Sequence, residues 1–163
     1  MSKYTNYASK PAGYAGQVAR GDQSLSRAWS RTNTETEKQI PTGVFVARAP
    51  AVGTDAFGVK LLATTNDKVD GVVVTTGVFK SVKPQDQASV MHIGHGDSVW
   101  VKMDSESPLT AGSEVKITVA DGKQGMIAAN GTINTPYYVV RTSSDLAEIA
   151  RDEIFTPVAE GGA

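Results

Sequence analysis

Two histidines and an aspartate form the densest group of chemically versatile side chains in the sequence. His92, His95 and Asp97 are spaced His-x-x-His-x-Asp, and imidazole and carboxylate groups are ligands that zinc and non-haem iron accept. A metal site needs all three side chains to converge and needs further partners that fix the imidazoles. Gly94 and Gly96 separate the three residues, and no fourth ligand follows at an obvious spacing. We therefore interpret the histidines as partly exposed residues at a strand end, and we predict no metal.

Other patterns that would indicate catalysis are missing from the sequence. The chain has no cysteine, which excludes a thiol nucleophile, a disulfide scaffold and thiolate-ligated zinc or iron–sulfur sites. It has no Gly-x-Ser-x-Gly nucleophile elbow and no glycine-rich phosphate loop. Asp104 and Glu106 are paired carboxylates, but the surrounding serines and Pro108 predict a solvated turn. We therefore predict a protein that is not an enzyme and that binds no cofactor.

Composition favours turns and short strands over long helices. Glycine accounts for 16 of 163 residues, above the usual ~7%. No apolar run approaches the ~18 residues that a membrane span needs, and no hydrophobic signal region follows the first four residues. We expect a soluble protein with no membrane partner.

Charge is distributed unevenly along the chain, although the total is only −1. Residues 1–40 carry six basic and three acidic side chains, and residues 41–163 carry ten basic and fourteen acidic ones. Valine and isoleucine also become frequent from Ile40 onward. We therefore predict an extended N-terminal arm, residues 1–40, joined at Pro41 to a β-rich body, residues 41–163.

Aromatic and basic side chains are interleaved along this arm. Such a mixture can stack on the bases of a single-stranded nucleic acid and contact its phosphates. It equally suits docking onto another protein, where Tyr, Trp and Arg are favoured contact residues. The basic residues are sparse, and Glu35 and Glu37 dilute them near the end of the arm. A solvated tail is the third interpretation.

Short β-branched runs separated by glycine turns predict that the body consists of β-strands. Alternation is clearest where Val99, Val101 and Met103 share one face, and a second alternating run includes Val115 and Ile117. Several short strands of this kind predict a small antiparallel β-barrel or sandwich. The expected strands cover residues 43–48, 59–62, 72–74 after an Asp70-Gly71 hairpin corner, 97–103, 114–119, 126–128 after an Asp121-Gly122 corner, and 137–140 after Pro136.

Two segments fit either a helix or a strand. In residues 144–151, Asp145 suits the N-cap of a short helix with Glu148 at the third position, or the segment is the closing strand. We favour the strand. Residues 22–32 remain open, because their apolar residues fit one helical face and their alternating residues fit one strand face.

Several motifs containing glycine and valine follow one another over residues 14–155. They are Tyr14-Ala15-Gly16-Gln17-Val18-Ala19, Ser30-Arg31, Ile40-Pro41-x-Gly43-x-Phe45-Val46, Asp70-Gly71-Val72-Val73-Val74, Ser89-Val90-Met91-His92, residues 97–103, Leu109-Thr110-Ala111-Gly112 and Asp121-Gly122-Lys123. In this order they resemble the structural cement proteins of tailed bacteriophages, which are capsid decoration proteins. The polar residues 142–144 depart from the family's pattern.

The resemblance implies a structural protein on the outer surface of the icosahedral phage head. It would bind the major capsid protein across capsomer junctions and stabilise the shell against the pressure of packaged DNA, after synthesis in the host cytoplasm. We expect self-association, with a homotrimer first and a dimer second, and no direct nucleic-acid contact. A phage tail or fibre β-module and a single-stranded nucleic-acid-binding β-barrel are the alternatives. The expected contact residues are Tyr4, Tyr7, Tyr14, Arg20, Arg27, Trp29 and Arg31.

Overall fold

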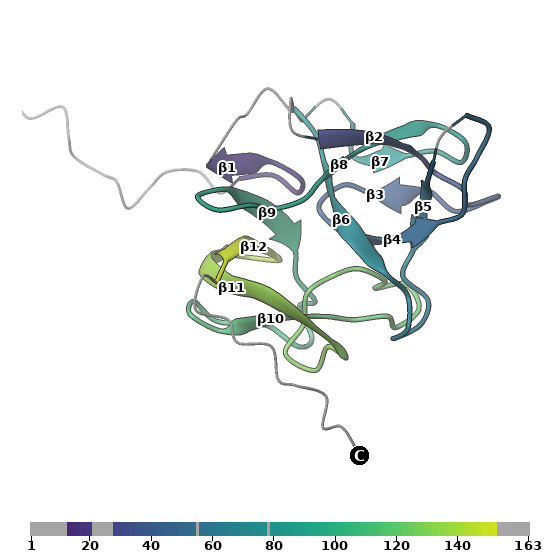
Figure 1. Ribbon diagram of the computed structural model, residues 1–163. Coiled ribbons are helices and arrows are strands. Elements are labelled where there is room, and N and C mark those ends of the chain that lie inside the picture. Colours follow the sequence, from purple (N-terminus) through teal and green to yellow (C-terminus); the bar gives the residue numbers. More distant parts are fainter. Residues whose placement is uncertain (1–12, 21–27, 55, 78, 153–163) are drawn as a thin grey trace, which may run out of the picture.

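The computed structural model describes residues 13–20, 28–54, 56–77 and 79–152, and these form strands and no helix (Figure 1). The first sheet, called here the β9 sheet, contains in spatial order β1 (Val18–Arg20), β9 (Ser98–Lys102), β12 (Leu146–Arg151), β11 (Ile133–Ser143) and β10 (Glu114–Ile117). The second, the β6 sheet, contains β2 (Ala28–Thr32), β8 (Gln87–Met91), β6 (Val69–Val74), β4 (Phe45–Ala49) and β5 (Gly58–Leu61). A two-stranded ribbon pairs β3 (Ile40–Pro41) with β7 (Ser81–Val82).

Every pair of neighbouring strands within these sheets is antiparallel. The prediction of a mainly β, antiparallel fold is therefore confirmed, and the arrangement is the sandwich rather than a closed barrel. The described residues contain no helix that could span a membrane.

The main hydrophobic core lies between the two five-stranded sheets. It combines Val99 and Val101 of β9 and Ile149 of β12 with Val72 and Val74 of β6, all at most 3% exposed. Successive side chains of a strand point to opposite faces, so only alternate residues of each strand reach this core. The prediction that alternate residues of 97–103 and of 114–119 face the core is therefore confirmed.

A second hydrophobic cluster covers the opposite face of the β6 sheet. Val46, Val73 and Val90 alternate with the residues that face the main core, and Ile40 of β3 belongs to the same cluster. The sheet curls over it, because Asn33, directly after β2, forms a parallel bridge to Val59 of β5. The amide nitrogen of the buried Asn33 side chain also donates to the carbonyls of residues 38, 82 and 83.

Residues from the predicted arm are built into both sheets. Residues 13–20 and 28–40 supply β1, β2 and β3, and β1 and β2 pair with β9 and β8. Residues 22–32, whose sequence fits either a helix or a strand, therefore form a strand from Ala28 onward. Residues 1–12 and 21–27 lie outside the described residues, so the boundary at residue 40 stays a prediction.

Gly16 connects the two sheets through its own backbone. Its N–H donates to the Trp100 carbonyl of β9 at 2.8 Å, and its carbonyl accepts from the Thr75 N–H, directly after β6, at 2.9 Å. Its φ is 82°, a conformation that favours glycine. A Cβ at this position would lie 2.8 Å from the Val73 carbonyl oxygen, so only glycine fits without a shift of the backbone.

Gly43 lies against Gly16 and connects the same two sheets. Its N–H donates to the Val73 carbonyl of β6, and its carbonyl accepts from the Lys102 N–H of β9, both at 2.7 Å. A Cβ on Gly43 would lie 2.8 Å from the nitrogen of Gly16 and 2.8 Å from the Cβ of Ala15. We call this contact between the two backbones the glycine crossing.

Three local predictions are wrong. Asp70 and Gly71 lie inside β6 instead of forming a corner. Gly71 packs closely against β8, since a Cβ there would be 2.5 Å from the Met91 carbonyl oxygen. Residues 126–128 form no strand, although Ile127 makes isolated bridges. Pro136 lies within β11 rather than before it. The Asp121-Gly122 turn and the closing strand β12 are confirmed.

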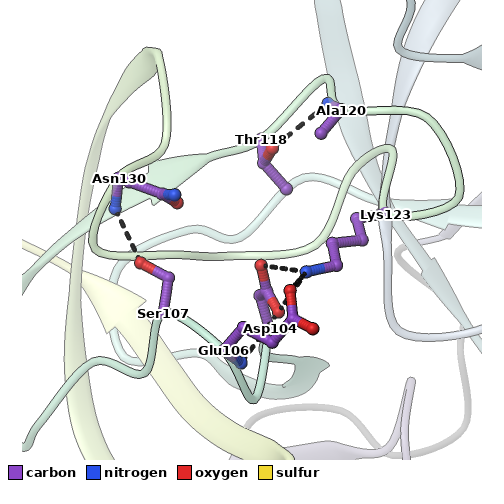
Figure 2. Close-up of polar contacts among 7 residues, drawn as sticks. All are labelled: Asp104, Glu106, Ser107, Thr118, Ala120, Lys123 and Asn130. Atoms are coloured by element: carbon purple, nitrogen blue, oxygen red, sulfur yellow. Dashed lines mark hydrogen bonds and ion pairs between the residues drawn. The ribbon is translucent and has the colours of Figure 1, made fainter.

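Two loops that follow β9 and β10 are joined by a charged contact (Figure 2). Lys123 Nζ lies 2.9 and 3.0 Å from the two carboxylate oxygens of Asp104 and also bonds to Glu106. Hydrogen bonds from Lys123 and from the Glu106 N–H lower the pKa of Asp104, and both carboxylates raise the pKa of Lys123. Asp104 is only 6% exposed, whereas the Glu106 side chain is 80% exposed. The predicted solvated turn is therefore exposed beyond Asp104 and anchored at Asp104.

Replacing Gly16 by Ala tests the glycine crossing. Gly112 is the matched control, because its φ is 86° and a Cβ there would meet nothing within 4 Å. Both variants force alanine into the left-handed region, at about 1–2 kcal/mol each. Only Gly16→Ala also presses a methyl group against a carbonyl, so we expect its free energy of unfolding to fall by at least about 2 kcal/mol more. Urea denaturation measures the free energy of unfolding of both variants. Equal losses in the two variants would contradict the stabilising role of the glycine crossing.

Candidate partner-binding surface

Exposed aromatic side chains and partly buried arginines gather on the β6 sheet. Trp29 of β2 is 58% exposed, and Phe57, directly before β5, is 37% exposed. The Arg31 guanidinium lies 5.3 Å from the Trp29 ring centre and 5.7 Å from that of Phe57. The Arg48 guanidinium lies 4.3 Å from the Phe57 ring centre. We call these four residues the Trp29 patch.

Strand pairing brings the patch together from distant parts of the sequence. Trp29 and Arg31 are two residues apart on β2 and therefore share one face of the sheet. Their cross-strand partners on β8 are Val90 and Ala88, which belong to the second hydrophobic cluster. The patch therefore lies on the face of the β6 sheet that points away from the main core.

A buried carboxylate holds the two guanidinium groups of the patch. Asp70 of β6 has a fully buried side chain, and its oxygens accept from Arg31 Nε at 3.2 Å and from Arg48 Nε and Nη2 at 3.1 and 2.9 Å. His92 Nε2 lies 3.4 Å from the same carboxylate. Burial acts to raise the pKa of Asp70, but the hydrogen bonds from Arg48 and Arg31 outweigh it and lower the pKa. The carboxylate therefore stays ionised and fixes both guanidinium groups.

This arrangement suits protein recognition rather than catalysis. Tryptophan and arginine are enriched among the residues that contribute most to binding energy at protein interfaces. Guanidinium groups that are already oriented lose little conformational entropy when a partner binds. Arg31 and Arg48 together outweigh the charge of Asp70, so the patch is cationic and suits a partner surface that presents carboxylates.

The four predicted contact residues that the structure describes lie at different places. Trp29 and Arg31 lie in the patch, whereas Arg20 is exposed at the end of β1. Tyr14 is 41% exposed and lies beside Gly77 at a different place. Tyr4, Tyr7 and Arg27 lie outside the described residues.

Sequence reasoning missed Arg48, Phe57 and Asp70 as members of this surface. The one available signal was the acidic residue within the valine-rich run 69–74, since a buried carboxylate requires a cationic partner. His92, weighed as a metal ligand, instead contacts Asp70. Among the residues that the structure describes, no three His, Cys, Asp or Glu side chains are grouped so as to hold a metal ion.

The described residues define an all-β protein, and comparison with known proteins gives its family. Residues 2–153 match the family described as structural cement protein (E217 gp24/Pam3 gp6). The match covers nearly the whole chain, so the chain belongs to the structural cement protein family of phages. It is a structural component of the phage head, and this family is not a class of enzymes. The resemblance noted from the sequence is confirmed.

A solved structure supports the fold. One chain of "The capsid of Myoviridae Phage XM1" superimposes with a TM-score of 0.58 at 14% sequence identity, covering 94% of this chain and 99% of that chain. At this identity the similarity shows a shared fold. No curated protein matches the sequence.

Replacing Asp70 by Asn tests whether this carboxylate holds the patch. We expect the free energy of unfolding at pH 7 to fall by about 2 kcal/mol, because two charge-assisted interactions are lost. The pKa of Asp70 is lowered in the folded state, so its contribution is complete above the ordinary carboxyl pKa of ~3.9 and is lost as the pH falls through the lower folded value. The difference between variant and parent must therefore shrink as the pH falls below about 4.

Urea denaturation at pH 7 and at about pH 3 measures this difference. Asp121→Asn is the control, because the Asp121 side chain is 92% exposed and its replacement should change stability by less than about 0.5 kcal/mol. A loss for Asp70→Asn that is no larger than that of the control at pH 7, or that persists unchanged in acid, would contradict the assignment.

Proposed function

We propose that the protein decorates the outer surface of the phage head, binds the major capsid protein across capsomer junctions, and stabilises the shell against the pressure of packaged DNA. The observation that carries the proposal is the family match over residues 2–153. The alternatives, a tail or fibre module and a single-stranded nucleic-acid-binding protein, lack such support.

A rigid body is what a protein that bridges a junction needs. Packaged DNA pushes neighbouring capsomers apart, so a bridging subunit resists only if its own parts do not slide. The glycine crossing joins β9 and β6 through the backbones of Gly16 and Gly43, and both sheets share one core. A pull on one sheet is therefore transmitted directly to the other.

The Trp29 patch and the N-terminal segment are the proposed capsid contacts. Residues 1–12 contain Lys3 and Lys10 and no acidic residue, and they lead into Gly13, which lies against the Trp100 indole. A cationic segment and a cationic patch on one subunit allow contact with two capsid proteins, and the second contact gains from effective concentration. The proposed contact set is the patch together with Tyr4, Tyr7, Tyr14, Arg20 and Arg27. Self-association as a homotrimer would multiply these contacts.

Replacing Trp29 by Ala tests the patch as a capsid contact. A central interface tryptophan contributes about 2 kcal/mol or more, so we expect affinity for undecorated expanded heads to fall by about 30-fold. Val140→Ala is the control, because Val140 is 38% exposed and lies on β11 of the other sheet. Co-sedimentation across a concentration series measures both affinities. Equal binding by Trp29→Ala and the parent would contradict the patch as a capsid contact.

Deleting residues 2–12 tests the N-terminal segment. All twelve described strands remain in this variant, so we expect its melting temperature to stay near that of the parent while head binding weakens by about 10-fold or more. Tyr4→Ser combined with Tyr7→Ser separates the aromatic contribution from that of the lysines. If the truncated protein binds heads as the parent does, this segment is not a capsid contact.

A further inference from the structure

A second exposed aromatic side chain borders a groove away from the Trp29 patch. Phe79, between β6 and β7, is 69% exposed. It lines a hollow of about 190 Å³, which we call the Phe79 groove and whose lining is Tyr14, Ala15, Thr42, Gly77, Phe79, Lys80 and Lys102. A neighbouring hollow of about 390 Å³ also includes Phe79 and Thr42 but contains Asp86 in its lining.

Contacts of Thr42 and Tyr14 hold part of the groove in shape. The N–H and the hydroxyl of Thr42 both donate to the Lys80 carbonyl, at 3.0 and 3.2 Å. The Tyr14 ring lies so close to Gly77 that a Cβ there would be 3.2 Å from Cζ of the ring. Because these contacts already order that part of the groove, a partner can bind there with little loss of conformational entropy.

The chemistry of the groove favours an apolar side chain flanked by carboxylates. Tyr14, Ala15 and Phe79 supply apolar surface, Lys80 and Lys102 supply positive charge, and none of the described residues that line the groove is acidic. Neither lysine forms an ion pair with a residue in the described part of the chain. The groove therefore suits an acidic segment that carries a large apolar residue.

We infer that the Phe79 groove binds residues 153–163 of a second copy of this chain. This segment begins Glu153-Ile154-Phe155, contains a second acidic residue at Glu160, and has no lysine or arginine. Phe155 suits the apolar part of the groove, and the glutamates suit the lysines. Polarity and charge thus match between a surface and a segment of the same sequence.

The direction of β12 carries the segment away from the groove of its own chain and so favours a neighbouring copy as the acceptor. β12 runs from Leu146, opposite Lys102, to Ala150, opposite Ser98, so the chain moves away from the groove by about 13 Å. The N–H of Asp152 then bonds to the Pro136 carbonyl of β11, farther from the β9 edge. The next eleven residues can span up to about 36 Å, which is enough to reach another subunit.

Exchange of this kind produces a head-to-tail contact that closes into a ring when the rotation permits. A ring of three would have every groove filled and no free segment. The inference rests on the self-association included in the proposed function. Its test uses no phage heads, so its failure would leave the head-binding proposal intact.

Cross-linking between single-cysteine variants tests the exchange, since the chain has no cysteine of its own. Lys80→Cys protein is mixed with Thr156→Cys protein and treated with a short bismaleimide. We expect a cross-linked band of twice the chain mass. Thr65→Cys replaces Lys80→Cys in the control, because Thr65 is exposed before the opposite end of β6, and this mixture should give no such band. Equal yields in the two mixtures, or none in either, would overturn the inference.

Two further samples separate exchange between copies from binding within one chain. The double variant Lys80→Cys/Thr156→Cys should yield cross-linked multimers, whereas a cross-linked monomer alone would show that the segment folds back on its own groove and would overturn the inference. In light scattering of the uncross-linked protein, Phe155→Ser should raise the dissociation constant for self-association by about 10-fold or more, and Ala159→Ser should leave it unchanged. An unchanged constant for Phe155→Ser would also overturn the inference.

Discussion

The body of this protein depends on the contact between two glycine backbones. Gly16 and Gly43 lie against each other, and each is hydrogen-bonded to both five-stranded sheets. A side chain at either position would separate the strands that these bonds join. The hydrophobic core alone can tolerate small sliding between sheets, whereas four short backbone hydrogen bonds at one place fix their relative position. This fixed geometry is the property that a capsid-bridging subunit requires.

Most strands were predictable from sequence because their valine and isoleucine residues are buried, on one face or on both. Alternation in β9 and β10 reports that burial directly, and the Asp121-Gly122 corner follows from the local conformation of glycine. The Asp70-Gly71 prediction failed because the role of Gly71 is set by β8, a strand that lies about twenty residues later in the sequence. Local rules for turns contain no information about a neighbouring strand.

The Trp29 patch was only half predictable for the same reason. Trp29 and Arg31 stand out in sequence as aromatic and basic residues in a polar segment. Arg48 and Phe57 join them only through the order β2-β8-β6-β4-β5, and Asp70 acts beneath them from a strand rich in valine. The resulting surface is a cationic patch on a body that carries most of the chain's acidic residues. Such polarity favours one orientation of the subunit on its partner.

An icosahedral reconstruction of decorated heads by cryo-electron microscopy tests the central claim most directly. We expect density for the two-sheet body outside the shell above the junctions between capsomers, with the Trp29 patch in contact with the capsid protein. Density for the protein only in the tail, or a subunit on the head with Trp29 facing solvent, would contradict the proposed role.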